Sequence, residues 1–217
     1  GLEIGEGAPG VAPAPPQEWQ VLALIGAGPN GRTYLAEQKT AGRRMVAVKI
    51  IDPLDSREAA RDRLEAALPR LTSIVHPNIP AVIGGGTTAE GAPYIVSEYV
   101  PGVSLEHARG RGPRPLDERI LTARQVAAAL EYGHRRCVAH GHVVPANVLL
   151  PRRDRPAARL ADYGTAAIAG RGVTIEGDVR ALLEVVIELL AELPALGEHA
   201  GSASEIHERL EAEARRA

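Results

Sequence analysis

The sequence is short of cysteine, of long apolar runs and of net charge, and each shortage excludes a class of protein. The single cysteine, Cys137, rules out an intrachain disulfide and a cysteine-based metal site, and it is typical of a reducing compartment. No stretch reaches the roughly 18 uninterrupted apolar residues that a membrane-spanning helix needs. A net charge of −2 gives no electrostatic reason to expect nucleic acid as a partner. We therefore expect a cytoplasmic protein without membrane insertion in this segment.

The 217 residues suffice for one compact domain or two small lobes, and their composition changes along the chain. Residues 1–18 are rich in Gly, Ala and Pro, which is typical of a linker or an extended arm. The chain begins with Gly and shows no secretory signal, so we expect a segment of a longer protein that can tether it. Residues 19–97 are rich in predicted strands and residues 103–217 in predicted helices, which indicates two lobes with a hinge at 98–102.

The hydrophobic patterns predict the individual elements. Strands are expected at 19–36 (a hairpin), 45–51, 79–83, 94–100, 148–150 and 158–161. Helices are expected from Asp55 to the interruption at Pro69, and at 117–135, 179–193 and 203–216. The fold class is therefore α+β.

A glycine motif, G-x-G-x-x-G, occurs at Gly26, Gly28 and Gly31. The dinucleotide-binding version needs a helix directly after the last glycine, whereas residues 32–36 are strand-like. The motif therefore favours a hairpin flap whose glycines let backbone amides approach phosphates. A glycine-rich turn without a ligand is the alternative.

A lysine, Lys49, interrupts the apolar run from Val46 to Ile51. A buried ammonium without a partner is costly, so this side chain needs a phosphate or a carboxylate. The alternative is a lysine at a sheet edge that extends its charge into water.

Further motifs follow in a fixed order: His76-Pro77-Asn78-Ile79, residues 93–102, 138–150 and 160–164, and Asp178-Val179-Arg180. Together with the glycine motif and Lys49 they resemble the Hanks-type Ser/Thr protein kinases, particularly bacterial ones, over residues 19–193. The resemblance implies a bilobal protein-kinase-like fold, with an antiparallel β-sheet N-lobe and a shortened helical C-lobe.

The resemblance also implies a nucleotide site and its cofactors, ATP and Mg²⁺. The adenine would lie between Ile25 and Ala47 on one side and Leu149 on the other, with backbone bonds to Glu98 and Val100 and Ser97 as a small gatekeeper. The glycine motif and Lys49 would meet the phosphates, and Asn147 and Asp162 would hold the metal.

Residues 138–147, which by resemblance form the catalytic loop, depart from the family pattern. His142 stands where the family has the catalytic Asp, Val144 where it has the Lys that steadies the γ-phosphate, and Gly141 where it has an Arg. An imidazole can accept a proton near neutral pH, but the base and its electrostatic helper are lost together. His140 is expected to be a packed core histidine. No catalytic residue is therefore intact.

The segment after Asp162-Tyr163-Gly164 is also shortened, because only thirteen residues, 165–177, precede Asp178. That length leaves no room for the usual activation loop and peptide-binding platform. By resemblance Tyr163 and Gly164 are structural and Asp178 anchors the catalytic-loop backbone; a helix N-cap is the alternative for Asp178.

The glutamate that should pair with Lys49 has two candidate positions. Counting back from His76 without a gap gives Ala67, whereas Glu65 fits only with two inserted residues, which the nearby Pro69 makes reasonable. If Glu65 fails, Lys49 must pair with Asp162 or with a phosphate.

The leading hypothesis is a pseudokinase, a regulatory or scaffolding module that recognises protein partners of unknown identity and still binds ATP with Mg²⁺. One alternative is an active Ser/Thr kinase that uses His142. A weaker one is a small-molecule phosphotransferase of the aminoglycoside-kinase type, which the motifs Asp162-Tyr163-Gly164 and His76-Pro77-Asn78-Ile79 disfavour. Whether the chain is an enzyme stays open, with the balance against activity.

Overall fold

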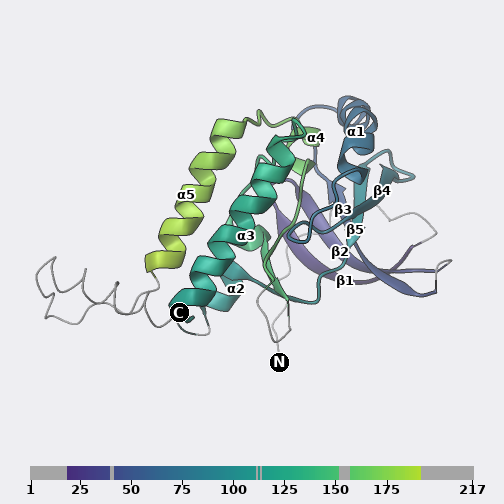
Figure 1. Ribbon diagram of the computed structural model, residues 1–217. Coiled ribbons are helices and arrows are strands. Elements are labelled where there is room, and N and C mark those ends of the chain that lie inside the picture. The colour runs from purple at the N-terminus through teal and green to yellow at the C-terminus, as the bar shows by residue number, and fades with distance from the viewer. Residues whose placement is uncertain (1–18, 40–41, 111, 113, 152–156, 192–217) are drawn as a thin grey trace, which may run out of the picture. The chain divides into compact units, whose positions relative to one another are not determined.

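The computed structural model describes residues 19–39, 42–110, 112, 114–151 and 157–191 (Figure 1). Within these ranges the chain forms two compact units. The first contains 19–75, 80–99 and 162–173, and the second contains 76–79, 100–161 and 174–191. The chain passes from the first unit to the second after Val75, after Tyr99 and after Val173.

The first unit is built on a five-stranded antiparallel sheet with strand order β1-β2-β3-β5-β4 (Figure 1). The strands are β1 (Trp19–Gly28), β2 (Gly31–Gln38), β3 (Arg44–Ile51), β4 (Val82–Thr87) and β5 (Pro93–Glu98). Successive side chains of a strand point to opposite faces. Val46, Val48 and Ile50 therefore share one face, where they pack into a buried cluster. Ala47 and Lys49 belong to the opposite face.

The β1–β2 turn is closed against β3. Gly31 has φ 126°, and a Cβ atom there would lie 2.0 Å from the carbonyl oxygen of Ile50. The backbone N–H of Asp52 donates to the carbonyl of Asn30 at 3.3 Å. Because an L side chain rarely adopts this φ and has no space here, only glycine fits at this position.

Helix α1 (Arg57–Thr72) packs against β4, where Leu64 and Leu68 lie next to Gly85. The expected start at Asp55 is wrong by one residue, since Ser56 is the N-cap and accepts a hydrogen bond from the Ala59 N–H at 3.1 Å. The expected interruption at Pro69 is also wrong.

Two features of the structure allow α1 to continue past Pro69. Pro69 and Glu65 are both exposed, so water can replace the backbone bond that proline cannot donate. The buried Leu71 stabilises the last turn. Helix α4 (Thr165–Ile168), which was not predicted, also lies against α1.

Strand β4 begins three residues later than expected. The backbone N–H groups of Asn78 and Ile79 bond to the Nδ1 and the carbonyl of His76, at 3.2 and 3.1 Å, so these residues close into a turn. Pro80 then has no N–H to offer a neighbouring strand.

The second unit has a small antiparallel sheet, β6-β7-β8, and most of the helices. Its elements are β6 (Gly102–Ser104), α2 (Leu105–Arg109), α3 (Leu116–His134), the 3₁₀ turn η1 (Pro145–Asn147), β7 (Val148–Pro151), β8 (Arg159–Leu160) and α5 (Ile175–Ala191). Helices α3 and α5 run side by side (Figure 1), and buried Arg119 of α3 donates to the Leu189 carbonyl of α5 at 3.1 Å. The helix expected at 203–216 lies outside the described residues.

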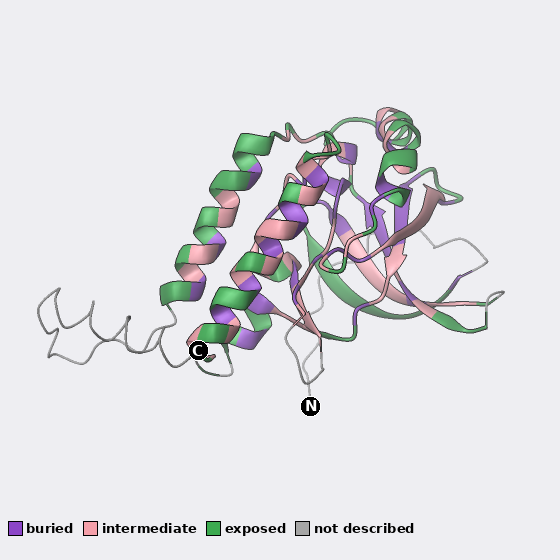
Figure 2. Ribbon diagram, in the orientation of Figure 1, coloured by how far each residue is buried: buried purple, intermediate pink, exposed green. Residues whose placement is uncertain are grey.

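Helix α5 begins four residues earlier than expected, because Thr174 caps it by accepting the Gly177 N–H at 2.9 Å. Much of the α5 ribbon is coloured as exposed (Figure 2). The large apolar residues of α5 that remain exposed are Ile175, Val179, Leu183, Ile187 and Leu190. Among the described helices, none is long and apolar enough to cross a membrane.

Replacing Gly31 by alanine should unfold the protein more easily, because the new Cβ would overlap the Ile50 carbonyl. We expect the free energy of unfolding, measured by urea titration, to fall by about 2 kcal/mol or more. Gly28→Ala is the matched control, since a Cβ at Gly28 meets nothing within 4 Å. Equal stability of the two variants would contradict the closed turn.

Candidate functional site

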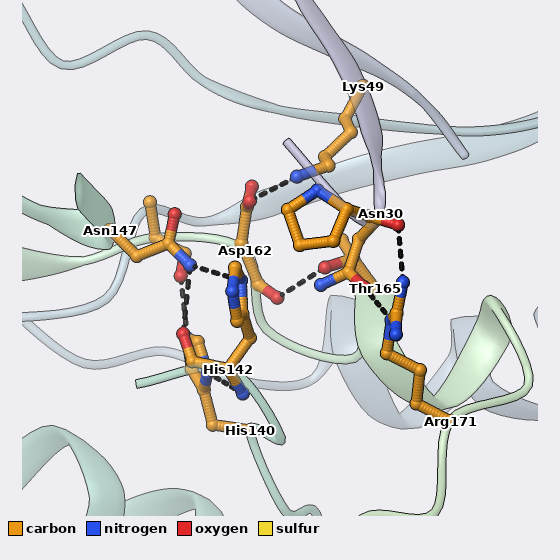
Figure 3. A network of polar contacts seen from close by, with 10 residues as sticks. Asn30, Lys49, His140, His142, Asn147, Asp162, Thr165 and Arg171 are labelled. Carbon is orange, nitrogen blue, oxygen red and sulfur yellow. Dashed lines mark hydrogen bonds and ion pairs between the residues drawn. The ribbon is translucent and has the colours of Figure 1, made fainter. Parts of the chain in front are cut away.

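The ammonium of Lys49 is paired with the carboxylate of Asp162 (Figure 3). Their side chains are only 10% and 16% exposed, and both belong to the first unit. The anion that the sequence demanded for Lys49 is therefore Asp162. Asp162 has φ 71°, a left-handed conformation that Asp tolerates better than most residues, and its carbonyl accepts the Thr165 hydroxyl at 3.0 Å.

Glu65 does not pair with Lys49. Its side chain is 73% exposed, and its nearest cation is Arg61, 4.0 Å away and four residues earlier on the same helix. Ala67, the position reached without a gap, is half-buried and carries no charge. Helix α1 therefore contributes no carboxylate to Lys49 in this structure.

Tyr163 and Gly164 fasten the segment that begins at Asp162. Tyr163 is buried. Gly164 has φ 77°, and a Cβ atom added there would lie only 2.8 Å from the Leu71 methyl groups. Glycine is thus required by both the backbone conformation and the contact with α1.

The residues expected around the adenine are divided between the two units. In the first unit Ala47 lies opposite Ser97 across β3 and β5, Glu98 is half-buried, and Ile25 is exposed on β1. In the second unit Val100 is buried, and half-buried Leu149 on β7 pairs with Ser104 and Arg159.

Arg171 is a residue of the first unit that sequence reasoning missed. Its Nε donates to Asn30 Oδ1, and a terminal guanidinium nitrogen donates to the Pro29 carbonyl at 2.6 Å (Figure 3). These partners are about 140 residues away in sequence, and no motif in the chain signals such a contact.

In the second unit His140 acts as a structural cross-link. It is fully buried; its Nδ1 accepts the His142 backbone N–H at 3.1 Å, and its Nε2 lies 2.6 Å from the Ala161 carbonyl oxygen. The first bond needs a bare Nδ1 and the second a hydrogen on Nε2, which together describe a neutral ring. Both ring nitrogens of His140 are therefore taken up by hydrogen bonds to the backbone.

Asp178 holds the start of the catalytic loop. The side chain is 1% exposed, and its oxygens accept the backbone N–H groups of His140 at 2.6 Å and Gly141 at 2.7 Å. The Nε2 of His134 lies 2.8 Å from the same carboxylate. Asp178 lies inside the first turn of α5, and the capping role belongs to Thr174.

His142 is bound to Asn147 through its proton-accepting nitrogen. The Asn147 amide donates to the His142 carbonyl at 2.8 Å, which fixes the amide NH₂ on that side, because a carbonyl only accepts. The same NH₂ lies 3.0 Å from His142 Nδ1. Nδ1 is therefore the acceptor, and the neutral ring carries its hydrogen on Nε2.

Each unit offers one oxygen donor of the kind that a hard cation such as Mg²⁺ prefers. The Asn147 NH₂ faces His142, so the side-chain atom that remains for a metal is an oxygen, Oδ1. Asp162 supplies a carboxylate. Mg²⁺ prefers such oxygen ligands and is commonly held by one or two carboxylates plus substrate phosphates.

A family model, the protein kinase domain, matches residues 19–182. The chain belongs to the protein kinase family. PknK of Mycobacterium tuberculosis, a serine/threonine-protein kinase, is 37% identical over 160 residues, which are 70% of this chain and 14% of that protein. The serine/threonine-protein kinase ULK3 of Xenopus laevis is 30% identical over 161 residues, 73% of this chain and 34% of that protein.

Solved structures give the same fold. The PknI kinase domain of M. tuberculosis matches with a TM-score of 0.66 and 27% identity, covering 85% of this chain and 78% of that one. Rad53 in complex with AMP-PNP matches with a TM-score of 0.60 at 23% identity, covering 69% of this chain and 39% of that one, and shows the fold alone. The expected kinase-like fold is confirmed.

Replacing Asp178 by asparagine should destabilise the second unit, because an amide NH₂ would face the N–H donors that the carboxylate now satisfies. We expect the free energy of unfolding in urea to fall by about 3 kcal/mol. Asp117→Asn, on the exposed first turn of α3, should change it by less than about 0.5 kcal/mol. Similar losses in both variants would contradict the anchoring role.

Proposed function

We propose that this chain is a catalytically inactive protein-kinase-like domain, a pseudokinase, that binds ATP with Mg²⁺ and acts in the cytoplasm as a regulatory or scaffolding module for protein partners. The observation that carries the proposal is the hydrogen bond from Asn147 to His142 Nδ1 at the catalytic position. In this geometry the histidine has no bare nitrogen that is ready to take a proton from a substrate hydroxyl.

Features besides the protonation of His142 also oppose catalysis. To act as a base through Nδ1, His142 must give up its bond to Asn147, the same residue that is proposed to hold the metal. Val144, at the position of the family's phosphate-steadying Lys, brings no positive charge. Stabilising the developing charge is the larger part of phosphoryl transfer, so the two changes together oppose catalysis.

Two features of the first unit support the proposed nucleotide binding. The glycine-rich strand β1 is exposed from Val21 to Gly28, and a Cβ at Gly28 would meet nothing within 4 Å, so a ligand has room to approach this strand. Lys49 holds a buried positive charge whose partner is the proposed metal ligand Asp162. These features support phosphate binding next to a metal ion.

If the domain is catalytically inactive, the unmodified protein and His142→Ala should both transfer phosphate at the background rate. The measurement is transfer of labelled γ-phosphate to the chain itself and to generic protein substrates, with His107→Ala, an exposed histidine on α2, as the control. Transfer that His142→Ala abolishes and His107→Ala leaves intact would support an active kinase that uses His142 instead.

The nucleotide clause predicts Mg²⁺-dependent ATP binding in isothermal titration calorimetry. Lys49→Met should weaken ATP binding by about tenfold or more, because the ammonium–phosphate attraction is lost. Asp162→Asn should remove most of the Mg²⁺ dependence, and Lys39→Met, an exposed lysine of the same unit, should change nothing. Absence of ATP binding with and without Mg²⁺ would contradict the proposed nucleotide binding.

A further inference from the structure

We propose that Arg171, which bonds to the tip of the glycine-rich hairpin, is a phosphate-binding residue that supplies a positive charge for the terminal phosphates of a nucleoside triphosphate. The inference rests on the proposed nucleotide binding and extends it to a residue of the shortened segment after Gly164. It concerns only groups of the first unit.

Arg171 is held firmly in place. Its backbone N–H donates to the carbonyl of Ala166 in α4, at 3.0 Å. Two bonds fasten α4 in turn: Arg63 Nε donates to the Ile168 carbonyl at 2.9 Å, and the Leu54 N–H donates to the Ala169 carbonyl at 2.8 Å. The guanidinium is therefore presented to the hairpin from a fixed segment.

The charge of Arg171 has no carboxylate partner among the described residues. Its acceptors, the Pro29 carbonyl and the Asn30 amide oxygen, are both neutral. Arg63, in the same unit, shows the usual alternative: its guanidinium forms two bonds to the Asp55 carboxylate, at 2.8 and 2.7 Å. Because bonds between a guanidinium and an anion are about twice as strong as neutral ones, an arriving phosphate is the better partner for Arg171.

The hairpin tip also contains a buried hydrogen-bond donor without an acceptor among the described residues. Asn30 is fully buried, and within the described part of the chain its Nδ2 has no hydrogen-bond partner. A buried donor without an acceptor is rare in folded proteins. An unpaired amide donor and an unneutralised guanidinium thus meet at Asn30, and a phosphate group supplies both the negative charge and the acceptor oxygens.

Arg171 also supplies a positive charge of the kind that is missing at Val144. Val144 occupies the position where related kinases carry the lysine that steadies the γ-phosphate. Arg171 brings a cation to the tip of the glycine-rich hairpin, the element proposed to contact phosphates. Its planar fork can bind two phosphate oxygens at once, which a lysine does not do.

Calorimetric titration with ATP, adenosine and tripolyphosphate tests this role. Arg171→Ala should weaken ATP and tripolyphosphate binding by about tenfold to a hundredfold and leave adenosine binding unchanged. Arg171→Gln, which keeps neutral donors, should behave like Arg171→Ala, and Arg171→Lys should retain part of the affinity. The matched control is Arg43→Ala, which removes an arginine that is 84% exposed and pairs with Glu37. Thermal unfolding checks that each variant is folded.

The outcomes separate this role from the proposed function. If the protein binds ATP and Arg171→Ala binds it equally well or more tightly, Arg171 is not a phosphate ligand, and tighter binding identifies a clamp that closes the hairpin. If Arg171→Gln keeps full ATP affinity, the residue only supports the hairpin, and the inference also fails. If the protein binds no ATP, the proposed nucleotide binding fails, and tripolyphosphate decides the role of Arg171. If tripolyphosphate does not bind, or binds equally well to Arg171→Ala, the inference is overturned.

Discussion

The buried ammonium of Lys49 is the constraint on which the candidate site depends. A positive charge that is 10% exposed requires an anion, and helix α1 provides none, because its acidic side chains point to solvent and Ala67 is uncharged. Asp162 fills this need. The residues after it are then fastened to the same unit through Gly164, α4 and Arg171, so one ion pair brings together two segments separated by 113 residues.

The second unit is organised around a buried carboxylate. Asp178 accepts two backbone N–H groups at the start of the catalytic loop, and His140 joins the loop to Ala161 through a neutral ring. Structural bonds therefore take up the polar groups on either side of His142. His142 itself belongs to this network through Asn147.

Much of the fold could be predicted from the sequence, and the failures have local causes. The hairpin, β3, β5 and α3 follow from alternation and helical periodicity, which depend on near neighbours in the chain. The continuation of α1 past Pro69 depended on the exposure of that turn and on the burial of Leu71. The late start of β4 depended on a turn closed by His76. Each of these reflects a tertiary or side-chain contact that a propensity cannot express.

The sequence by itself identified the protein kinase family and the need of Lys49 for an anion, and it predicted that His142 stands where the family has the catalytic Asp. Only the tertiary structure decided which anion that is, that Glu65 is exposed, and that Arg171 reaches the glycine-rich hairpin. Residue identity reveals what chemistry is present or missing. Pairing between groups more than a hundred residues apart is set by packing, and a single sequence carries no signal for it.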